Sequence, residues 1–249
     1  MAGHSKWAGI KHKKAVIDAK RAKRWTKLIR EVMVSARLGG GDPDFNPRLR
    51  SAVLDAKADN VPNETIDRAI KKGTGDLEGE SYEEVSYEGY GPAGVAVLVE
   101  AMTDNRNRTA AEIRHLFSKH GGNLGESGCV AWMFDRRGYF AIERGSLSEE
   151  GLMELALELG VEDIELGDEA YELYTAPEDY ARVRDELETR GIDVAAAELA
   201  MIPQSTIEPG EKADSVLRLV DAIEDHDDVQ HVWANFEVDE GVLAAQTSE

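Results

Sequence analysis

The order of strand-like and helix-like segments after residue 82 constrains the fold of this chain most. The strand-like segments of its middle part are 130–134, 139–142, 164–166, 170–174 and 195–202. Amphipathic patterns predict helices over 148–159, with Ser148 as the cap, and over 178–190, which follows Pro177. With the neighbouring segments 130–134 and 139–142 counted together as the first β element, residues 130–203 follow the order β-α-β-β-α-β, which predicts a complete ferredoxin-like unit.

The flanks of this unit carry a second, smaller set of elements. Strands are expected at 82–90 and 95–101, helices at 108–120 and 212–224, and a last strand at 229–238. Glycines and a proline at 91–94 make the first two strands a hairpin. The flanks thus follow the order β-β-α and then α-β, so we expect the middle unit to be inserted into an outer α/β sandwich.

Before residue 82 the patterns are helical. Residues 15–38 predict a helix whose apolar stripe consists of Trp25, Leu28, Ile29, Val32 and Ala36. Gly39 is expected to end this helix, and Asn46 and Pro47 are expected to open a second one.

A third short helix begins at Pro62 and Asn63 and is expected to close at Gly73. The glycine-rich, acidic segment 73–81 is typical of a linker. The expected fold class is α+β: an N-terminal three-helix domain followed by two ferredoxin-like α/β sandwich domains, one inserted in the other. The expected domains are a basic helical domain at 1–78, a discontinuous α/β domain at 79–129 plus 205–249, and an inserted ferredoxin-like domain at 130–204.

Charge is divided unevenly along the chain. The formal net charge is −20, yet residues 1–30 hold ten Lys or Arg and one acid, Asp18. The first 72 residues carry +9, so the remaining 177 carry −29. We call the first 72 residues the basic head and the remaining 177 the acidic body. A polyanion would be attracted to the basic head only, which indicates nucleic acid as the partner. The alternative is a solvated helix face with a basic tail. The acidic body could also bind a protein partner.

Other classes of protein lack support in the sequence. No apolar run approaches about 18 residues, and the N-terminus has no apolar signal-peptide core, so no membrane contact is expected. The single cysteine, Cys129, excludes an intramolecular disulfide framework and CxxC sites and suits the cytoplasm. No phosphate loop, nucleophile elbow or paired metal motif is present, although Glu112 and His115 have the spacing of half a di-metal motif. We therefore expect no enzyme activity, no cofactor, no metal and no small-molecule substrate.

The segment 103–128 is the exception within the acidic body, because residues 104–120 sum to +2. Arg106 and Arg108 stand beside asparagines at an expected helix start, where side chains and free N–H groups can hold phosphates together. An N-capped, solvated helix explains the same residues equally well.

Several long motifs resemble the YebC/PmpR family, which includes the mitochondrial translational activator of cytochrome c oxidase. They are GHSKW at 3–7, IKHKK at 10–14, LGGGDPDFNPRLR at 38–50, RAIKKGTG at 68–75, YEGYGPAGVAV at 87–97, TDNRNRTAAEIRHLFSKHGGNLGESG at 103–128 and VAWMFDRRG at 130–138. The resemblance implies a three-domain layout and one of two non-enzymatic functions. One is DNA-binding transcription regulation, and the other is action on the ribosome, helping synthesis through proline-rich or otherwise stalling stretches.

The expected nucleic-acid contacts combine the family motifs with the basic helix. They are His4, Ser5, Lys6, Trp7, Lys11, His12, Lys13, Lys14, Lys20, Lys23, Arg24, Lys27, Arg106 and Arg108. Lys and Arg suit phosphates rather than base edges, and an aromatic beside cations suits unpaired RNA bases. Ribosomal RNA is therefore favoured over duplex DNA, although Trp7 could equally anchor the helical bundle. A metal-dependent nuclease would need clustered carboxylates, for which the sequence gives no sign.

Overall fold

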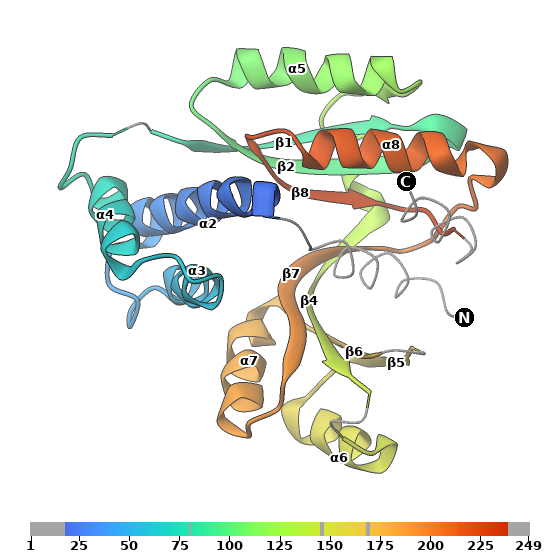
Figure 1. The fold of residues 1–249 in the computed structure, drawn as a ribbon. Helices are drawn as coiled ribbons and strands as arrows, with labels where there is room; N and C mark the ends of the chain where they lie inside the picture. The colour runs from blue at the N-terminus through green and yellow to red at the C-terminus, as the bar shows by residue number, and fades with distance from the viewer. Residues whose placement is uncertain (1–17, 80, 145–146, 168–169, 239–249) are drawn as a thin grey trace. The chain divides into compact units, whose positions relative to one another are not determined.

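A computed structural model describes residues 18–79, 81–144, 147–167 and 170–238 (Figure 1). Within these ranges the chain forms two units, each with its own core. One unit holds residues 18–131 and 209–234, and the other holds 132–208 and 235–238. The second unit is thus inserted in sequence into the first, as the alternation of patterns indicated. The boundaries of the three expected domains stay a prediction.

The first unit begins with three helices. They are α2 (Asp18–Gly39), α3 (Pro47–Ala58) and α4 (Asn63–Thr74). Their small apolar side chains share one core, in which Val32 and Leu49 are fully buried and Trp25 is partly buried. The Asn46 side chain accepts a hydrogen bond from the Leu49 amide and Pro47 occupies the first helical position, so the predicted start of α3 is confirmed.

Two glycines differ from their expected roles. Helix α2 continues through Gly39, and Gly40 is the residue with a left-handed φ of +88°. Gly73 does not close α4, which extends to Thr74 before Gly75 takes the left-handed cap. Gly73 instead lies against the Met33 carbonyl of α2, where a side chain would collide with the backbone. A close helix–helix approach, rather than a helix end, explains this glycine.

The rest of the first unit is a four-stranded antiparallel sheet in the order β3-β1-β2-β8. Its elements are β1 (Glu83–Tyr90), a 3-10 turn (Pro92–Gly94), β2 (Ala96–Thr103), α5 (Arg106–Lys119), β3 (Asn123–Leu124), a 3-10 turn (Gly210–Lys212), α8 (Ala213–Glu224) and β8 (Val229–Ala234). Helices α5 and α8 cover one face of the sheet (Figure 1). The expected hairpin is confirmed, whereas the two-residue β3 was not predicted.

The second unit is a ferredoxin-like sandwich with strand order β5-β6-β4-β7. Its elements are β4 (Phe134–Glu143), α6 (Glu149–Leu159), β5 (Asp163–Leu166), β6 (Ala170–Thr175), a 3-10 turn (Pro177–Asp179), α7 (Tyr180–Thr189) and β7 (Val194–Pro203). The buried core contains Phe140, Leu152, Leu173 and Val183. The fold class expected from the sequence is thus confirmed, including the cap that Ser148 provides for α6.

The strand predicted at 130–134 is wrong over most of its length. Residues Ala131–Met133 form a 3-10 turn, and β4 then runs unbroken from Phe134 through 135–138, which sequence patterns had left between two strands. The reason lies in β1, where the Glu88 carboxylate accepts the amide protons of Val130 and Ala131. These bonds hold the segment in a turn that a strand ladder could not satisfy.

Candidate nucleic-acid interface

The described structure begins partway through the expected contacts. Eight of them lie outside the described residues: His4, Ser5, Lys6, Trp7, Lys11, His12, Lys13 and Lys14. Lys20 lies within α2, whose side chains are described from Lys23 onward. The positions of Lys23, Arg24, Lys27, Arg106 and Arg108 are therefore the ones that the structure gives.

Lys23, Lys27 and Arg30 form one row along α2, because spacings of four and three residues return to the same side of a helix. The Lys23 Nζ donates to the Asp225 carbonyl at 2.9 Å, and the Lys27 Nζ donates to the Glu224 carbonyl at 2.9 Å. These carbonyls end α8, where the helix dipole is negative and acceptors lack helical partners. The lysines of the row therefore cap α8, whereas the sequence placed them on a face open to solvent or to a partner.

Arg30, the third residue of this row, pairs with a buried carboxylate. Its Nη1 lies 3.1 Å from the Asp228 Oδ1 and donates to the Asp227 carbonyl. The exposed fractions of the two charged side chains are only 11% for Arg30 and 4% for Asp228. A buried ion pair is costly to break, so this pair fixes α2 against the turn between α8 and β8.

The Asp228 carboxylate also accepts hydrogen bonds from side chains at the end of β2 and the start of α5. Its Oδ2 accepts from the Thr109 hydroxyl at 2.7 Å, from the Arg108 Nη2 at 2.7 Å and from the Thr103 hydroxyl at 3.3 Å. Together with Arg30, these groups form what we call the Asp228 hub. The hub joins α2, β2, α5 and the turn before β8 through one buried carboxylate.

The hub lowers the pKa of the Asp228 carboxyl below its ordinary value. Burial by itself raises this pKa, because a charge is poorly solvated away from water. The hydrogen bonds from Thr109 and Arg108 and the charge of Arg30 act in the opposite direction and outweigh burial. The carboxylate is therefore ionised at neutral pH and binds its donors as an anion.

Arg24 lies outside the row and outside the hub. Its Nε is 2.9 Å from the Asp59 Oδ2, and the neighbouring Trp25 Nε1 donates to the Asp59 carbonyl at 3.0 Å. The Arg24 side chain is nevertheless 60% exposed. Asp59 is only 17% exposed, so transfer of this guanidinium to a phosphate would leave a mostly buried carboxylate without its ion-pair partner.

The two expected arginines of α5 have different environments. Arg106 is 63% exposed and its closest described carboxylate is that of Glu83, at 3.8 Å. Arg108 donates to Asp228 and to Asp104. The hydrogen bond to Asp228, and after it the one to Asp104, raises the pKa of the Arg108 guanidinium above its ordinary value. Asn105 caps the helix by accepting from the Arg108 amide. Arg106 is the more available of the two cations for a ligand.

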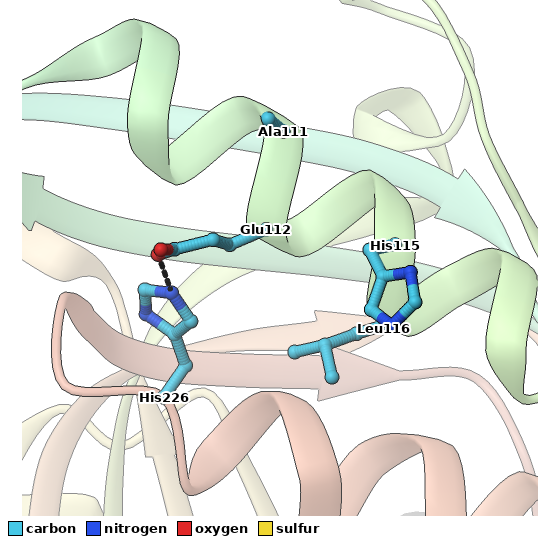
Figure 2. Close-up of a pocket in the computed structure, with 5 residues that line it drawn as sticks. All are labelled: Ala111, Glu112, His115, Leu116 and His226. Atoms are coloured by element: carbon cyan, nitrogen blue, oxygen red, sulfur yellow. Dashed lines mark hydrogen bonds and ion pairs between the residues drawn. The ribbon is translucent and has the colours of Figure 1, made fainter.

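A shallow pocket of about 410 Å³ lies beside the hub, between α5 and the end of α8. It is lined by Ala111, Glu112, His115, Leu116 and His226, and Figure 2 shows His226 and Glu112 pointing toward one another. The His226 Nδ1 accepts from the Asp228 amide at 3.1 Å, so its proton is on Nε2, which donates to the Glu112 Oε2 at 2.8 Å.

His226 links this pocket to the hub through the Asp228 amide. Glu112, whose spacing from His115 resembled half a metal motif, is paired with His226 instead. Within the ranges that the structure describes, no group of three His, Cys, Asp or Glu side chains could hold a metal ion. No helix in those ranges is both long and apolar enough to cross a membrane.

Sequence patterns missed the residues that organise this region. Thr103 and Thr109 are fully buried, and Asp228 belongs to a short acidic run that is typical of a solvated turn. The partners Arg30 and Asp228 are almost two hundred positions apart, and hydrophobic periodicity carries no signal for such a pair. Glu88 was missed for the same reason, although it is only 4% exposed and holds three amides of the loop before β4.

Comparisons with known proteins match both parts of the chain. A family profile described as the TACO1/YebC N-terminal domain matches residues 5–76, and one described as the TACO1/YebC second and third domain matches residues 82–236. A "probable transcriptional regulatory protein" of Syntrophobacter fumaroxidans is 55% identical over 245 residues, covering 98% of both chains. One from Pelotomaculum thermopropionicum is 56% identical over 243 residues, covering 96% of this chain and all of its own.

A solved structure shares the fold. The crystal structure of a conserved hypothetical protein from Aquifex aeolicus superimposes with a TM-score of 0.86 at 54% sequence identity. The match covers 95% of this chain and 98% of the Aquifex chain. The two profiles and the length of these alignments show that the chain belongs to the TACO1/YebC family.

Proposed function

We propose that the protein is a non-enzymatic, nucleic-acid-binding regulator of gene expression that acts in the cytoplasm on ribosomal RNA. Its basic head docks near the peptidyl-transfer region and favours a productive geometry of tRNA or nascent chain on stalling, proline-rich stretches. The ribosome supplies the chemistry, so the protein needs no cofactor or catalytic residue of its own. A regulatory role agrees with the name that the curated relatives carry, "probable transcriptional regulatory protein".

The observation that carries the choice of RNA is that two sides of α2 are already in use. A recognition helix reads duplex DNA by placing a free polar face in the major groove. In α2, Val32 and Ala36 face the core of the three-helix bundle, and Lys23 and Lys27 on the other side bind the end of α8. Insertion of α2 into a groove would require undocking it from α8, whereas contacts through residues 1–14 would not.

The test is a competition between ribosomes and DNA at about 0.15 M salt, near physiological ionic strength. The protein is sedimented with purified ribosomes, and excess duplex DNA carrying its own promoter is then added. We expect it to remain with the ribosomes, and we expect a variant with Lys11, Lys13 and Lys14 changed to Glu to be lost from them. Retention of that variant would contradict the proposed basic contact.

A matched control separates a local contact from net charge. Changing Arg136, Lys212 and Arg218 to Glu alters the net charge by the same amount, at exposed positions of the acidic body in the described structure. This control should sediment with ribosomes like the wild type. A positive outcome leads to translation of a proline-run reporter, in which the wild type should relieve stalling and the Lys11, Lys13 and Lys14 variant should not.

The second candidate is a DNA-binding transcription regulator, which the names of the relatives favour. Arg106 and the start of α5 would then add phosphate contacts to those of the basic head. Sequence-dependent release from ribosomes to promoter DNA in the same competition would support this candidate and overturn the first.

A further inference from the structure

The loop between α2 and α3 presents large apolar side chains to solvent. We call residues 38–46, which include the last two residues of α2, the apex loop. Phe45 is 86% exposed and Leu38 is 65% exposed. Single exposed apolar residues are common on protein surfaces. The apex loop differs because hydrogen bonds fix the backbone on both sides of Phe45.

Asn46 organises the apex loop from below. It is 5% exposed, and its Nδ2 donates to the carbonyls of Ser35 and Gly40, each at 2.8 Å. Its Oδ1 accepts from the Leu49 amide at 3.1 Å. A single buried amide thus ties the loop to both helices and fixes the position from which Phe45 projects.

The outer part of the apex loop is also fixed. The Asp44 amide donates to the Asp42 Oδ1 at 3.0 Å, and the Phe45 amide donates to the Asp42 carbonyl at 3.2 Å. The Arg50 guanidinium reaches back to the carbonyls of Pro43 and Asp44 at 3.1 and 2.9 Å. Conformational entropy that binding would otherwise remove is therefore already lost on folding, which favours a role in recognition.

Helix capping does not account for Phe45. A residue before the N-cap can stabilise a helix by packing on the fourth helical residue, when both are apolar. That residue is Arg50, whose guanidinium binds loop carbonyls, and a side chain that is 86% exposed buries almost no area. Removal of the Phe45 ring should therefore leave folding unchanged.

The charges around Phe45 favour one class of partner. Asp42 and Asp44 are exposed on either side of Pro43, and Arg50 is half-buried beneath them. The two nearby exposed cations are engaged elsewhere: Arg48 pairs with Glu31 and Glu84, and Arg37 donates to Ser81 and to the Tyr82 carbonyl. Carboxylates at this spacing repel phosphates, so base stacking on nucleic acid is disfavoured. We infer that the apex loop docks on a basic protein surface, with Phe45 filling an apolar pocket and Asp42 and Asp44 facing the cations around it. This inference rests on the proposed function, in which the basic surface belongs to a protein component of the ribosome.

The test compares two probes: salt-washed bacterial ribosomes, and protein-free rRNA extracted from the same ribosomes. Phe45→Ala should weaken binding to ribosomes about 10- to 30-fold, as loss of a buried aromatic anchor does, and should leave rRNA affinity unchanged. Leu157→Ala is the matched control, since Leu157 is 84% exposed on α6, and it should bind both probes like the wild type. Both variants should unfold within about 1–2 °C of the wild type.

A second variant distinguishes protein from RNA by the sign of its effect. Asp42→Asn with Asp44→Asn keeps the turn, because an Asn Oδ1 accepts the same amide. On a basic protein surface this variant binds ribosomes more weakly, whereas beside phosphates it binds more tightly. Weaker binding of Phe45→Ala to naked rRNA, or equal binding of Phe45→Ala and wild type to ribosomes, would overturn the docking inference. Failure of the wild type to bind ribosomes would overturn the proposed function together with it.

Discussion

Replacing Asp228 with Asn tests whether the hub holds α2 against the α/β part of its unit. The substitution keeps the size of the side chain and one of its two oxygens but removes its charge. In the wild type, Oδ2 accepts from Thr109 and Arg108 while Oδ1 faces Arg30. An amide has one oxygen and one NH2 group, so in either orientation it turns a donor toward another donor.

The cost follows from how deeply each partner is buried. Removing one member of a buried ion pair costs about 3–5 kcal/mol when the other charge has nowhere to go. Arg30 is in that position, with 11% of its side chain exposed, whereas Arg108 is 42% exposed and keeps Asp104. We therefore expect a loss of about 3 kcal/mol, at the low end of that range, which for a chain of this size lowers the unfolding temperature by about 6–12 °C.

Asp227→Asn is the matched control for the same measurement. Asp227 is 72% exposed and lies 3.7 Å from the Lys23 Nζ, so its loss should cost less than about 1 kcal/mol. Calorimetry of both variants gives the comparison, and the transition to follow is that of the unit containing the hub, because the two units need not unfold together. Equal unfolding temperatures for the two variants would refute the argument that the buried carboxylate fixes α2.

Three further outcomes follow from the same contacts. Folding lowers the pKa of the Asp228 carboxyl from its ordinary value of 3.8. The contribution of this carboxylate to the free energy of unfolding is therefore complete above pH 3.8 and is lost as the pH falls through the pKa of the folded state. The difference in unfolding free energy between wild type and Asp228→Asn should therefore be constant from about pH 5 to 7 and shrink in acid titrations. Glu88→Gln should cost about 1–3 kcal/mol and speed hydrogen exchange of residues 125–131, because its NH2 group faces amide donors. Arg106→Ala should fold normally and weaken polyanion binding less than the lysine reversals, whereas Arg108→Ala should also destabilise the hub in calorimetry.

Local signals in the sequence were sufficient for most of the elements. The pair Asn46 and Pro47 marks a helix start because one side chain caps amides and the other lacks the amide that would need capping. The β-α-β-β-α-β order of the second unit was readable because each element is short, amphipathic and separated by turn residues. These signals depend only on residues within a few positions of one another.

Contacts between distant segments account for what the sequence did not predict. Gly73 lies inside α4 because a neighbouring helix approaches it, and the 3-10 turn before β4 follows from a carboxylate more than forty residues away. The basic face of α2 is a further example, because its lysines meet the end of α8 about two hundred residues later in the chain. A helical pattern shows which residues leave the apolar stripe, and it does not show what they meet.

The row on α2 binds carbonyls more than carboxylates, and this distinction matters for the proposed function. Lys23 and Lys27 donate to the backbone at the end of α8, where the partial charges of a helix terminus are smaller than a full negative charge. Their positive charge is therefore only partly cancelled, and half of the Lys23 side chain remains exposed. Lys23 also lies 3.7 Å from the exposed Asp227 carboxylate, whereas Arg30 is paired with the buried Asp228. The row can thus attach the head to the rest of its unit and still contribute to the positive potential that attracts a polyanion, provided that direct contacts are made elsewhere on the head.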